Sequence, residues 1–525
     1  MQVLSILLSV TLLLAACTTV TPNPVLRPTL TQPLPISTNT AVPPSPTSTG
    51  SPTPIVGFQV QPWAALPSDG ELLVYGSGIA DGQTLYAADP LEEIAYEYRF
   101  PATTRFATPL LAGLSPDARY FVYFEGGEIE DFYGQLQLRT TKPDLVLHVL
   151  ELASGEVIFS TPLLSLAYPD DLTQIAERIK EDWTFTHFNY TFDDVIVATQ
   201  NLMLDRIRNV AWSPDGSLLA YLSQDPGPST DLYFFSPASG NIWQVMNEPD
   251  HVLRRAWSPD SSAIVLVTST YDRMAREDTT YVLDRKGTIL AKFTSQITYF
   301  HHWHDAGHAI LYGATDAGDA FEPKAISTAD GSTNLLWDGS FGVIAFTPDL
   351  STYLISSFIP NAPQPPGPGL FLGKAGGNSL LTLSNELGWA VTYWGSEQFT
   401  FAASNSGEET VGVTPEGVMV TIGSGSFRLS VSPDGNYLAG YNKIYLSSPP
   451  GTLPGLRIFA GNGQLLEAVD DLDIVCVAWN AASTALAYQA EDGLYVWNAT
   501  DNSSHIVATG LDSEECTIGW VSDKP

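Results

Sequence analysis

The chain has 525 residues, of which 44% are hydrophobic and 15% charged, so it can bury one large core or several repeated ones. Its formal net charge of −34 argues against nucleic-acid binding, which requires Lys and Arg to neutralise phosphates. The same charge disfavours an anionic lipid surface as a direct ligand.

The amino terminus begins with an apolar run at residues 3–16 that is too short to span a bilayer comfortably and ends in small residues before a cysteine. This pattern is typical of a secretory signal peptide. The end of the run resembles the lipobox of bacterial lipoproteins: Leu14, Ala15, Ala16 and Cys17. The resemblance implies a signal peptide over 1–16, lipidation of Cys17 and a lipid-anchored protein outside the cytoplasm, at the cell surface or on the periplasmic face of the bacterial envelope. A plain signal peptide or an uncleaved anchor is the alternative.

Residues 17–56 follow as a segment of Thr, Pro, Ser and small residues, in which Arg27 is the only charged side chain. Such a segment cannot bury enough apolar surface to fold, and its prolines keep it extended. We expect a disordered stalk with a reach on the order of 100 Å, at about 3.1 Å per residue in the polyproline II form.

A short motif then recurs through the rest of the chain. An apolar or aromatic residue is followed by Ser or Thr, Pro and Asp, and then by an apolar-rich strand; clear copies begin at Leu114, Trp212, Trp257, Phe346 and Val431. Weaker copies contain Asp69, Trp303, Trp394, Trp479 and Trp520. Most copies are separated by about 40 to 48 residues, close to the length of a four-stranded propeller blade.

The motif resembles the TolB-type, WD40-like propeller repeat, which also occurs in relatives of prolyl oligopeptidase. The resemblance implies an all-β fold, with a single propeller of four-stranded blades over residues 57–525. We expect eight blades, with seven or nine as alternatives, and an irregular blade in the short window 397–434. The last strand, around Trp520, is expected to complete the first sheet and close the ring.

One window, 117–215, is twice the usual length and is expected to hold a blade plus an insertion at about 124–205. Within the insertion, residues 169–183 have the pattern of an amphipathic helix. The helix is expected either to pack on the rim of a blade or to form a lid over one mouth of the channel.

Every component of the motif has a structural role, so we interpret it as scaffold. Pro restricts the turn backbone, Asp accepts bonds from nearby amides, Gly tolerates positive φ, and Trp packs between blades. The residues assigned to this role are Trp212, Pro214, Asp215, Gly216, Trp257, Pro259, Asp260, Trp303, Pro348, Asp349, Pro433, Asp434, Gly435 and Trp479. A catalytic carboxylate would not need repetition in blade after blade.

Two further groups of side chains could carry chemistry. His302, His304 and His308 could bind zinc or copper, although the segment also aligns with the repeat turn, which makes ordinary turn substitutions the simpler interpretation. Cys476 and Cys516 are the cysteines left in an exported chain and suggest one disulfide, with two free thiols as the alternative.

Two functions are compatible with these features. The first is an anchored propeller that binds or scaffolds an envelope or extracellular protein, a peptide or a glycan. The second is an extracytoplasmic hydrolase or lyase that acts on carbohydrate or peptide at a propeller mouth. The sequence favours the first, because it contains no nucleophile elbow, no Walker or Rossmann glycine motif and no residue that we assign to catalysis. No cofactor is expected.

Overall fold

The computed structural model describes residues 53–522 outside a set of gaps. The gaps are 55–57, 68–69, 77–83, 101–103, 107–109, 126–143, 166–209, 224–229, 249–250, 273–274, 296–297, 306, 315–320, 330–331, 337–342, 358–367, 376–378, 387, 406–408, 425–427, 443–454 and 512–515. The expected signal peptide, Cys17, most of the stalk and the expected helix at 169–183 therefore lie outside the described residues. Two units divide the chain, at residues 1–47 and 48–525. No helix among the described residues is long and apolar enough to cross a membrane.

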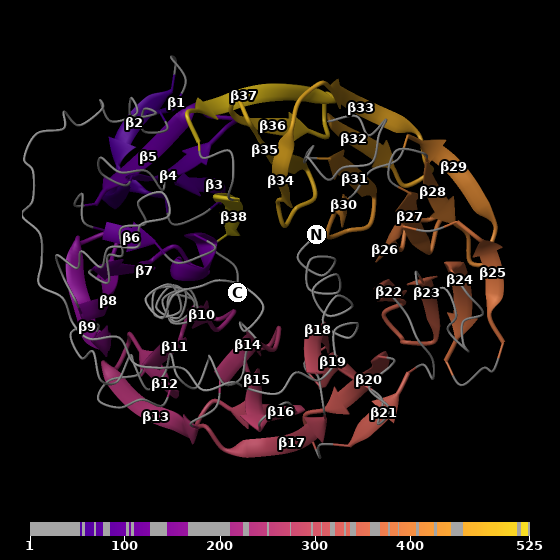
Figure 1. Ribbon diagram of the computed structural model, residues 1–525. Helices are drawn as coiled ribbons and strands as arrows, with labels where there is room; N and C mark the ends of the chain where they lie inside the picture. Colours follow the sequence, from indigo (N-terminus) through magenta and orange to yellow (C-terminus); the bar gives the residue numbers. More distant parts are fainter. Residues whose placement is uncertain are drawn as a thin grey trace, which may run out of the picture. The chain divides into compact units, whose positions relative to one another are not determined.

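The second unit is a ring of nine antiparallel blades, named I to IX here (Figure 1). Blade I pairs β38 (Ile518–Ser522), β3 (Glu71–Gly76), β4 (Thr84–Asp89), β5 (Ile94–Arg99) and β2 (Gln59–Pro62). Blade II pairs β6 (Thr104–Phe106), β7 (Tyr120–Glu125), β8 (Asp144–Glu151) and β9 (Glu156–Ser165). Blade III pairs β10 (Ala211–Trp212), β11 (Leu219–Ser223), β12 (Thr230–Ser236) and β13 (Asn241–Glu248).

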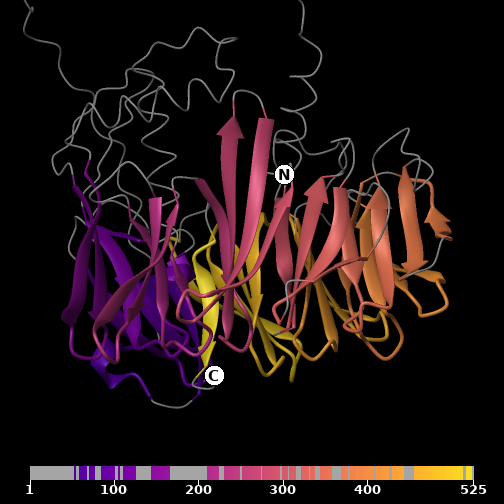
Figure 2. The same cartoon turned by 90° about the horizontal axis from the view of Figure 1, so that it is seen from below.

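The next three blades have the same order of pairing. Blade IV consists of β14 (His251–Trp257), β15 (Ala263–Asp272), β16 (Ala275–Asp284) and β17 (Ile289–Ser295). Blade V consists of β18 (Thr298–Asp305), β19 (His308–Ala314), β20 (Phe321–Ser327) and β21 (Thr333–Leu335). Blade VI consists of β22 (Val343–Phe346), β23 (Thr352–Ser357), β24 (Gly369–Lys374) and β25 (Leu381–Ser384). Figure 2 shows that the hairpin of β15 and β16 rises above the neighbouring strands on one side of the ring.

The last three blades complete the ring. Blade VII consists of β26 (Trp389–Tyr393), β27 (Phe401–Asn405), β28 (Thr410–Val413) and β29 (Met419–Gly423). Blade VIII consists of β30 (Arg428–Val431), β31 (Tyr437–Asn442), β32 (Gly455–Ala460) and β33 (Leu465–Asp470). Blade IX consists of β34 (Ile474–Trp479), β35 (Ala485–Ala490), β36 (Leu494–Asn498), β37 (Ser503–Thr509) and β1 (Thr53–Pro54). Two short 3-10 helices, η1 (Trp63–Ala65) and η2 (Leu110–Gly113), join the first strands.

The expected number of eight blades is wrong: the ring has nine. The window 397–434, which we expected to be irregular, contains β27, β28 and β29 of an ordinary blade. It is short because only four residues (406–409) separate β27 from β28, whereas twelve (443–454) separate β31 from β32 in blade VIII. The range 124–205 also contains β8 and β9, so blade II accounts for part of the expected insertion.

The two ends of the described chain meet in the first and last blades. As expected, β38 pairs antiparallel with β3, with Trp520 opposite Leu73, and supplies the inner strand of blade I. At the outer edges, β1 pairs with β37 and β2 pairs in parallel with β5. Residues 53–54 therefore belong to the propeller rather than to the stalk, and both added strands cover edges that would otherwise be open to pairing with another chain.

The hydrophobic core lies in the layers between neighbouring blades. Between blades III and IV, for example, Leu222 and Phe234 from one sheet form a buried cluster with Trp257 and Leu266 from the next. This is face-to-face sheet packing, in which each blade buries both of its faces. A blade can therefore be stable only beside its neighbours.

A hydrogen bond repeats across five of these layers. The indole Nε1 of a tryptophan on a blade's inner strand donates to a backbone carbonyl of the preceding blade. That carbonyl belongs to the residue one before the position equivalent to the tryptophan. The bonds are Trp212 to Gly113 (3.0 Å), Trp257 to Ala211 (3.1 Å), Trp303 to Ala256 (2.9 Å), Trp479 to Ser430 (3.3 Å) and Trp520 to Ala478 (2.9 Å). We call this set the tryptophan ladder.

Blade VII departs from the ladder. Its turn is one residue longer than that of blade III, because the Trp394 amide bonds to the carbonyl of Thr400, whereas the Ser213 amide bonds to that of Leu218. Tyr393, and not Trp394, therefore takes the position of Trp212. A shift of one residue sends a side chain to the opposite face of a strand. Trp394 accordingly packs toward blade VIII, beside Phe459.

We predict that Trp257→Phe destabilises the protein more than Trp497→Phe, by about 1 kcal/mol, which is the typical net contribution of one hydrogen bond. Both indoles are buried. Trp257 Nε1 donates to the Ala211 carbonyl, whereas Trp497 Nε1 has no acceptor among the described residues. Urea unfolding followed by circular dichroism measures the difference. An equal or smaller loss for Trp257→Phe would contradict the structural role of the ladder.

Candidate functional site

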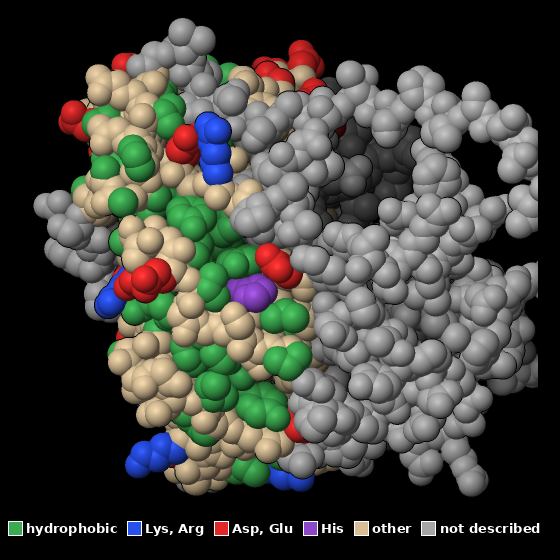
Figure 3. Space-filling model, turned by 90° about the vertical axis from the view of Figure 1, so that its left-hand side faces the viewer, with side chains coloured by type: hydrophobic (Ala, Val, Ile, Leu, Met, Phe, Trp, Pro, Cys, Tyr) green, Lys and Arg blue, Asp and Glu red, His purple; other side chains and the backbone are tan. Residues whose placement is uncertain are grey.

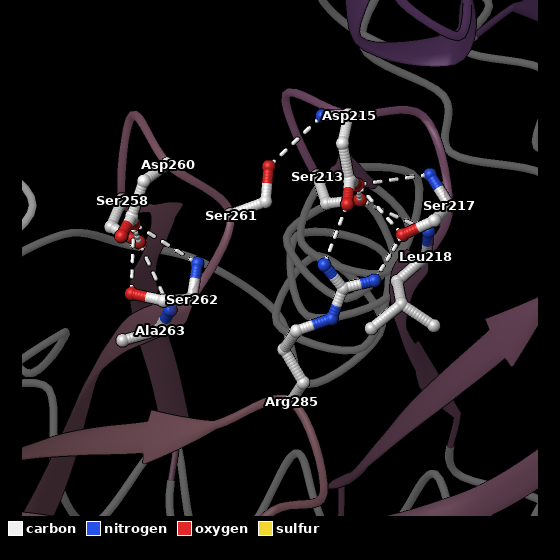
Figure 4. Close-up of polar contacts among 10 residues, drawn as sticks. All are labelled: Ser213, Asp215, Ser217, Leu218, Ser258, Asp260, Ser261, Ser262, Ala263 and Arg285. Atoms are coloured by element: carbon white, nitrogen blue, oxygen red, sulfur yellow. Dashed lines mark hydrogen bonds and ion pairs between the residues drawn. The ribbon is translucent and has the colours of Figure 1, made fainter. Parts of the chain in front are cut away.

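Asp215 organises the turn between the first two strands of blade III (Figure 4). Its Oδ1 accepts hydrogen bonds from Ser213 Oγ (2.6 Å), Ser217 N (3.1 Å) and Ser217 Oγ (2.7 Å). Ser213 Oγ in turn accepts from the Leu218 amide (3.0 Å). Gly216 follows at φ 67°, a conformation that favours glycine.

The same arrangement recurs in other blades. Oδ1 of Asp260 accepts from Ser258 and Ser262, that of Asp349 from Thr347 and Ser351, and that of Asp434 from Ser432 and Asn436. Pro259, Pro348 and Pro433 precede these carboxylates, as Pro214 precedes Asp215. The residue after Asp has positive φ in each turn: Gly216, Ser261, Leu350 and Gly435.

These hydrogen bonds keep the turn carboxylates ionised. Hydrogen bonds from Thr347 and Ser351 lower the pKa of Asp349 to about 2. Partial burial works against ionisation at Asp215, yet the bonds from Ser213, Ser217 and Arg285 outweigh it and hold the pKa below its usual range. A general acid needs a pKa near the working pH, so neither carboxyl is suited to that role near neutrality.

Burial raises the pKa of two other carboxyls, Asp231 and Glu467. Asp231 lies on β12 in blade III and Glu467 on β33 in blade VIII, on opposite sides of the ring (Figure 1). Hydrolysis of a glycoside requires two carboxyls about 5–10 Å apart. These two therefore do not form a catalytic pair.

An ion pair joins the turn of Asp215 to the next blade. Arg285, in the turn between β16 and β17 of blade IV, places Nη1 2.6 Å from Asp215 Oδ2, and its Nη2 donates to Ser217 Oγ (Figure 4). Arg285 was assigned no role from the sequence. The sequence feature that could have pointed to Arg285 is a basic residue in a turn between two strands of a strongly acidic chain.

A cleft opens at the corresponding place between blades VI and VII. It has a volume of about 420 Å³ and is lined by described residues only, among them Asp349 and Thr352 of blade VI and Tyr393, Thr400 and Pro415 of blade VII. The volume lies within the about 300–1,000 Å³ typical of sites for small ligands. The cleft is lined by one ionised carboxylate, several hydroxyl groups and two aromatic rings, those of Tyr393 and Phe401.

The three histidines do not form a metal site with a third ligand. His302 and His304 lie on β18 with ring centroids 6.4 Å apart, and His308 is exposed at the start of β19. Burial, with a smaller contribution from His304, lowers the pKa of His302 to about 4. Within the part of the chain that the structure describes, no three His, Cys, Asp or Glu side chains come together as ligands.

Cys476 and Cys516 are joined by a disulfide, with Cα atoms 5.7 Å apart. Cys476 lies on β34 of blade IX, and Cys516 stands two residues before β38. The bond therefore ties the last blade to the strand that closes the ring.

Arg255 is a partly buried cation, with Nε and Nη2 shielded from solvent, that sequence reasoning did not single out. Its Nε and Nη2 have no hydrogen-bond partner among the described residues, and burial lowers its pKa to about 9. Equivalent positions of other blades hold Val210, Leu429 and Val477. A charge at an apolar position of the repeat was the signal that could have found it.

The outer face shown in Figure 3 carries acidic and basic side chains scattered among hydrophobic and uncharged ones. Its described residues form no cluster of Lys and Arg. The described part of this face therefore has no basic patch of the kind that binds a nucleic acid.

Comparisons with known proteins support no assignment to a family. No protein family matches the chain. A segment of 58 residues is 36% identical to an uncharacterized peptidase, YuxL, of Bacillus subtilis (strain 168), and covers 11% of this chain and 9% of the peptidase. The chain thus matches only a small fraction of the length of this curated relative.

Solved structures with a similar trace include a eukaryotic initiation factor (12% identity, TM-score 0.43, covering 88% of this chain and 93% of that one). The propeller domain of the trilobed protease of Pyrococcus furiosus (10% identity, TM-score 0.35) covers 75% and 92%. TolB of Acinetobacter baumannii (13% identity, TM-score 0.29) covers 77% and 83%. With TM-scores this low, these likenesses add nothing to what the nine sheets establish.

We predict that Asp215→Asn destabilises the protein by about 1 kcal/mol at pH 7, a value that allows for solvent screening of this half-exposed ion pair. The pKa of Asp215 is lowered in the folded state, so its carboxylate stabilises the fold above the unfolded pKa of about 4 and loses that effect as the pH falls further. The deficit of the variant should therefore shrink below pH 4 in urea titrations. A deficit that stays constant from pH 7 to pH 3 would contradict this account.

Proposed function

We propose that the protein is a membrane-anchored binding or scaffolding propeller outside the cytoplasm. Cys17 carries the lipid anchor, the Thr/Pro-rich stalk holds the ring away from the membrane, and the ring binds an envelope or extracellular protein, a peptide or a glycan. The net charge of −34 makes a partner with a basic surface favourable and a nucleic acid unfavourable.

One observation carries the proposal. The repeated carboxylates serve the turns and have lowered pKa values at Asp215, Asp260, Asp349 and Asp434, while one of them, Asp349, also lines an open cleft. An ionised carboxylate held in a rigid turn is suited to recognising a cation. It is unsuited to transferring a proton at neutral pH.

The second candidate is an extracytoplasmic hydrolase or lyase that acts on peptide or carbohydrate. The 58-residue likeness to a peptidase favours it. Against it stands the separation of the two carboxyls with raised pKa, Asp231 and Glu467, in different blades.

Site-specific photo-cross-linking tests binding at the cleft. The cross-linker replaces Glu416, which is exposed beside Pro415, or Lys286, which holds the same place in the equivalent turn of blade IV. In the full-length protein in its own cells, we expect a discrete adduct from position 416 and none from position 286. Adducts from neither position, together with turnover of peptides or polysaccharides by the purified protein, would reverse the order of the two candidates.

Anchoring is tested separately by fractionation. We expect the native chain in the membrane fraction with acyl groups on Cys17, and Cys17→Ser in the soluble fraction, because several acyl chains hold a protein firmly at a bilayer. Mass spectrometry of the amino-terminal peptide identifies the modification. An unmodified Cys17 in the membrane fraction would contradict lipid anchoring.

A further inference from the structure

The junction of blades III and IV shows how this fold neutralises a turn carboxylate. Asp215 uses Oδ1 for its own turn and presents Oδ2 to the neighbouring blade. Arg285 of blade IV meets Oδ2 with Nη1, and its Nη2 donates to the hydroxyl of Ser217. The junction is thus a complete guanidinium site made of one carboxylate and one serine.

The junction of blades VI and VII has the same acceptor group. Asp349 Oδ1 accepts from Thr347 Oγ1 (2.6 Å), Ser351 N (3.0 Å) and Ser351 Oγ (2.8 Å), which matches the bonds of Asp215. Ser351 corresponds to Ser217. Among the described residues, Asp349 Oδ2 has no hydrogen-bond donor and no ion-pair partner, and the side chain is exposed.

The donor, however, is missing. Gly287 donates to the Asp284 carbonyl in the turn of Arg285, and Gly417 donates to the Thr414 carbonyl in the turn of blade VII. These matching bonds place Pro415 at the position of Arg285. Proline has neither charge nor donor, so the carboxylate of Asp349 faces an open cleft.

A junction between blades that lacks the arginine–carboxylate ion pair can still be closely packed. Between blades VII and VIII the corresponding turns hold Ser396 and Gly461, and they pack closely: a Cβ placed on Gly461 would lie 3.2 Å from Cβ of Ser396. Small uncharged residues close that junction. Blades VI and VII instead retain an acidic residue and leave about 420 Å³ beside it.

The rest of the lining fits a flat cation with several donors. Thr400 and Thr414 add hydroxyl groups to the cleft, and Tyr393 adds an aromatic ring at the position where other blades carry the ladder tryptophan. Guanidinium groups pair with carboxylates and stack on aromatic rings. Lys374, which pairs in the sheet with Thr352, forms no ion pair with Asp349.

We propose that the cleft between blades VI and VII binds the guanidinium of an arginine side chain presented by a protein partner, which takes the place that Arg285 fills between blades III and IV. This inference rests on the proposed binding function and names the chemistry of its partner. The low pKa of Asp349, about 2, keeps the site anionic throughout the physiological range.

Binding of a fluorescein-labelled Gly-Gly-Arg-Gly-Gly peptide to the full-length protein tests the inference, by fluorescence anisotropy at low salt. The peptide with citrulline in place of arginine is the neutral control. We expect the citrulline peptide to bind the wild-type protein at least about tenfold more weakly than the arginine peptide does. The arginine peptide should lose a similar factor in affinity for Asp349→Asn, because each change removes a charge-assisted hydrogen bond. Asp215→Asn should bind as the wild type does, since Arg285 already occupies that junction.

Pro415→Arg supplies a second, independent variant. It should restore the missing donor, occupy the cleft from within the chain and abolish peptide binding without loss of thermal stability. Wild-type affinity in both Asp349→Asn and Pro415→Arg, or equal affinity for the arginine and citrulline peptides, would overturn the inference. An adduct at position 416 that persists in Asp349→Asn would leave the proposed function standing and reject the guanidinium site. Absence of any adduct, together with turnover of peptides or polysaccharides by the purified protein, would reject the function itself.

Discussion

An indole N–H that is removed from water without an acceptor costs free energy. For five tryptophans of this propeller, the acceptor is a backbone carbonyl of the preceding blade. Trp212, Trp257 and Trp303 link blades II to V in an unbroken series, and Trp479 and Trp520 link blades VIII, IX and I. Because each bond crosses a hydrophobic layer, it sets the position of one sheet against the next. The same bond is present where the ring closes, since Trp520 belongs to the strand that completes blade I.

The ladder is interrupted where the candidate site lies. Blade VI ends its first strand with Phe346 and blade VII with Tyr393, neither of which has an indole N–H. The charged tie between turns is also lost there, because Pro415 stands where blade IV has Arg285. Neither tie is present at this junction, which contains a cleft, and the retained Asp349 gives that cleft its charge. The scaffold and the candidate site are thus built from the same repeat. They differ in which hydrogen-bond and ion-pair partners the adjacent blade supplies.

The class of fold could be read from the repeat, because a four-stranded blade imposes a period on Ser-Pro-Asp turns and the strands that follow them. The number of blades could not be predicted in the same way. The copies of the motif delimit nine windows, but known propellers mostly have four to eight blades, which favoured eight. Trp394 misled the alignment because the turn of blade VII has one extra residue, a detail that shows only in the backbone bonds. The sequence suggested a disulfide between Cys476 and Cys516, with two free thiols as the alternative, and the two cysteines are joined in the structure.

The candidate site could not be predicted from the sequence. Asp349 is one Asp among several equivalent ones, and Pro415 is an ordinary turn residue until the two turns are seen to face each other. What distinguishes this junction is an acidic residue that lines an open cleft across a blade boundary from Pro415, which lies 66 residues later in the chain. A local sequence pattern shows which residues a turn contains, but it does not show which residues of the adjacent blade face that turn.

The most direct test of the account is a crystal structure of the protein soaked with N-acetyl-arginine amide. The account predicts a guanidinium at Asp349 Oδ2, between the turns of blades VI and VII, in the orientation that Arg285 adopts against Asp215. A cleft filled by the protein's own side chains, or a ligand bound only elsewhere on the ring, would contradict it.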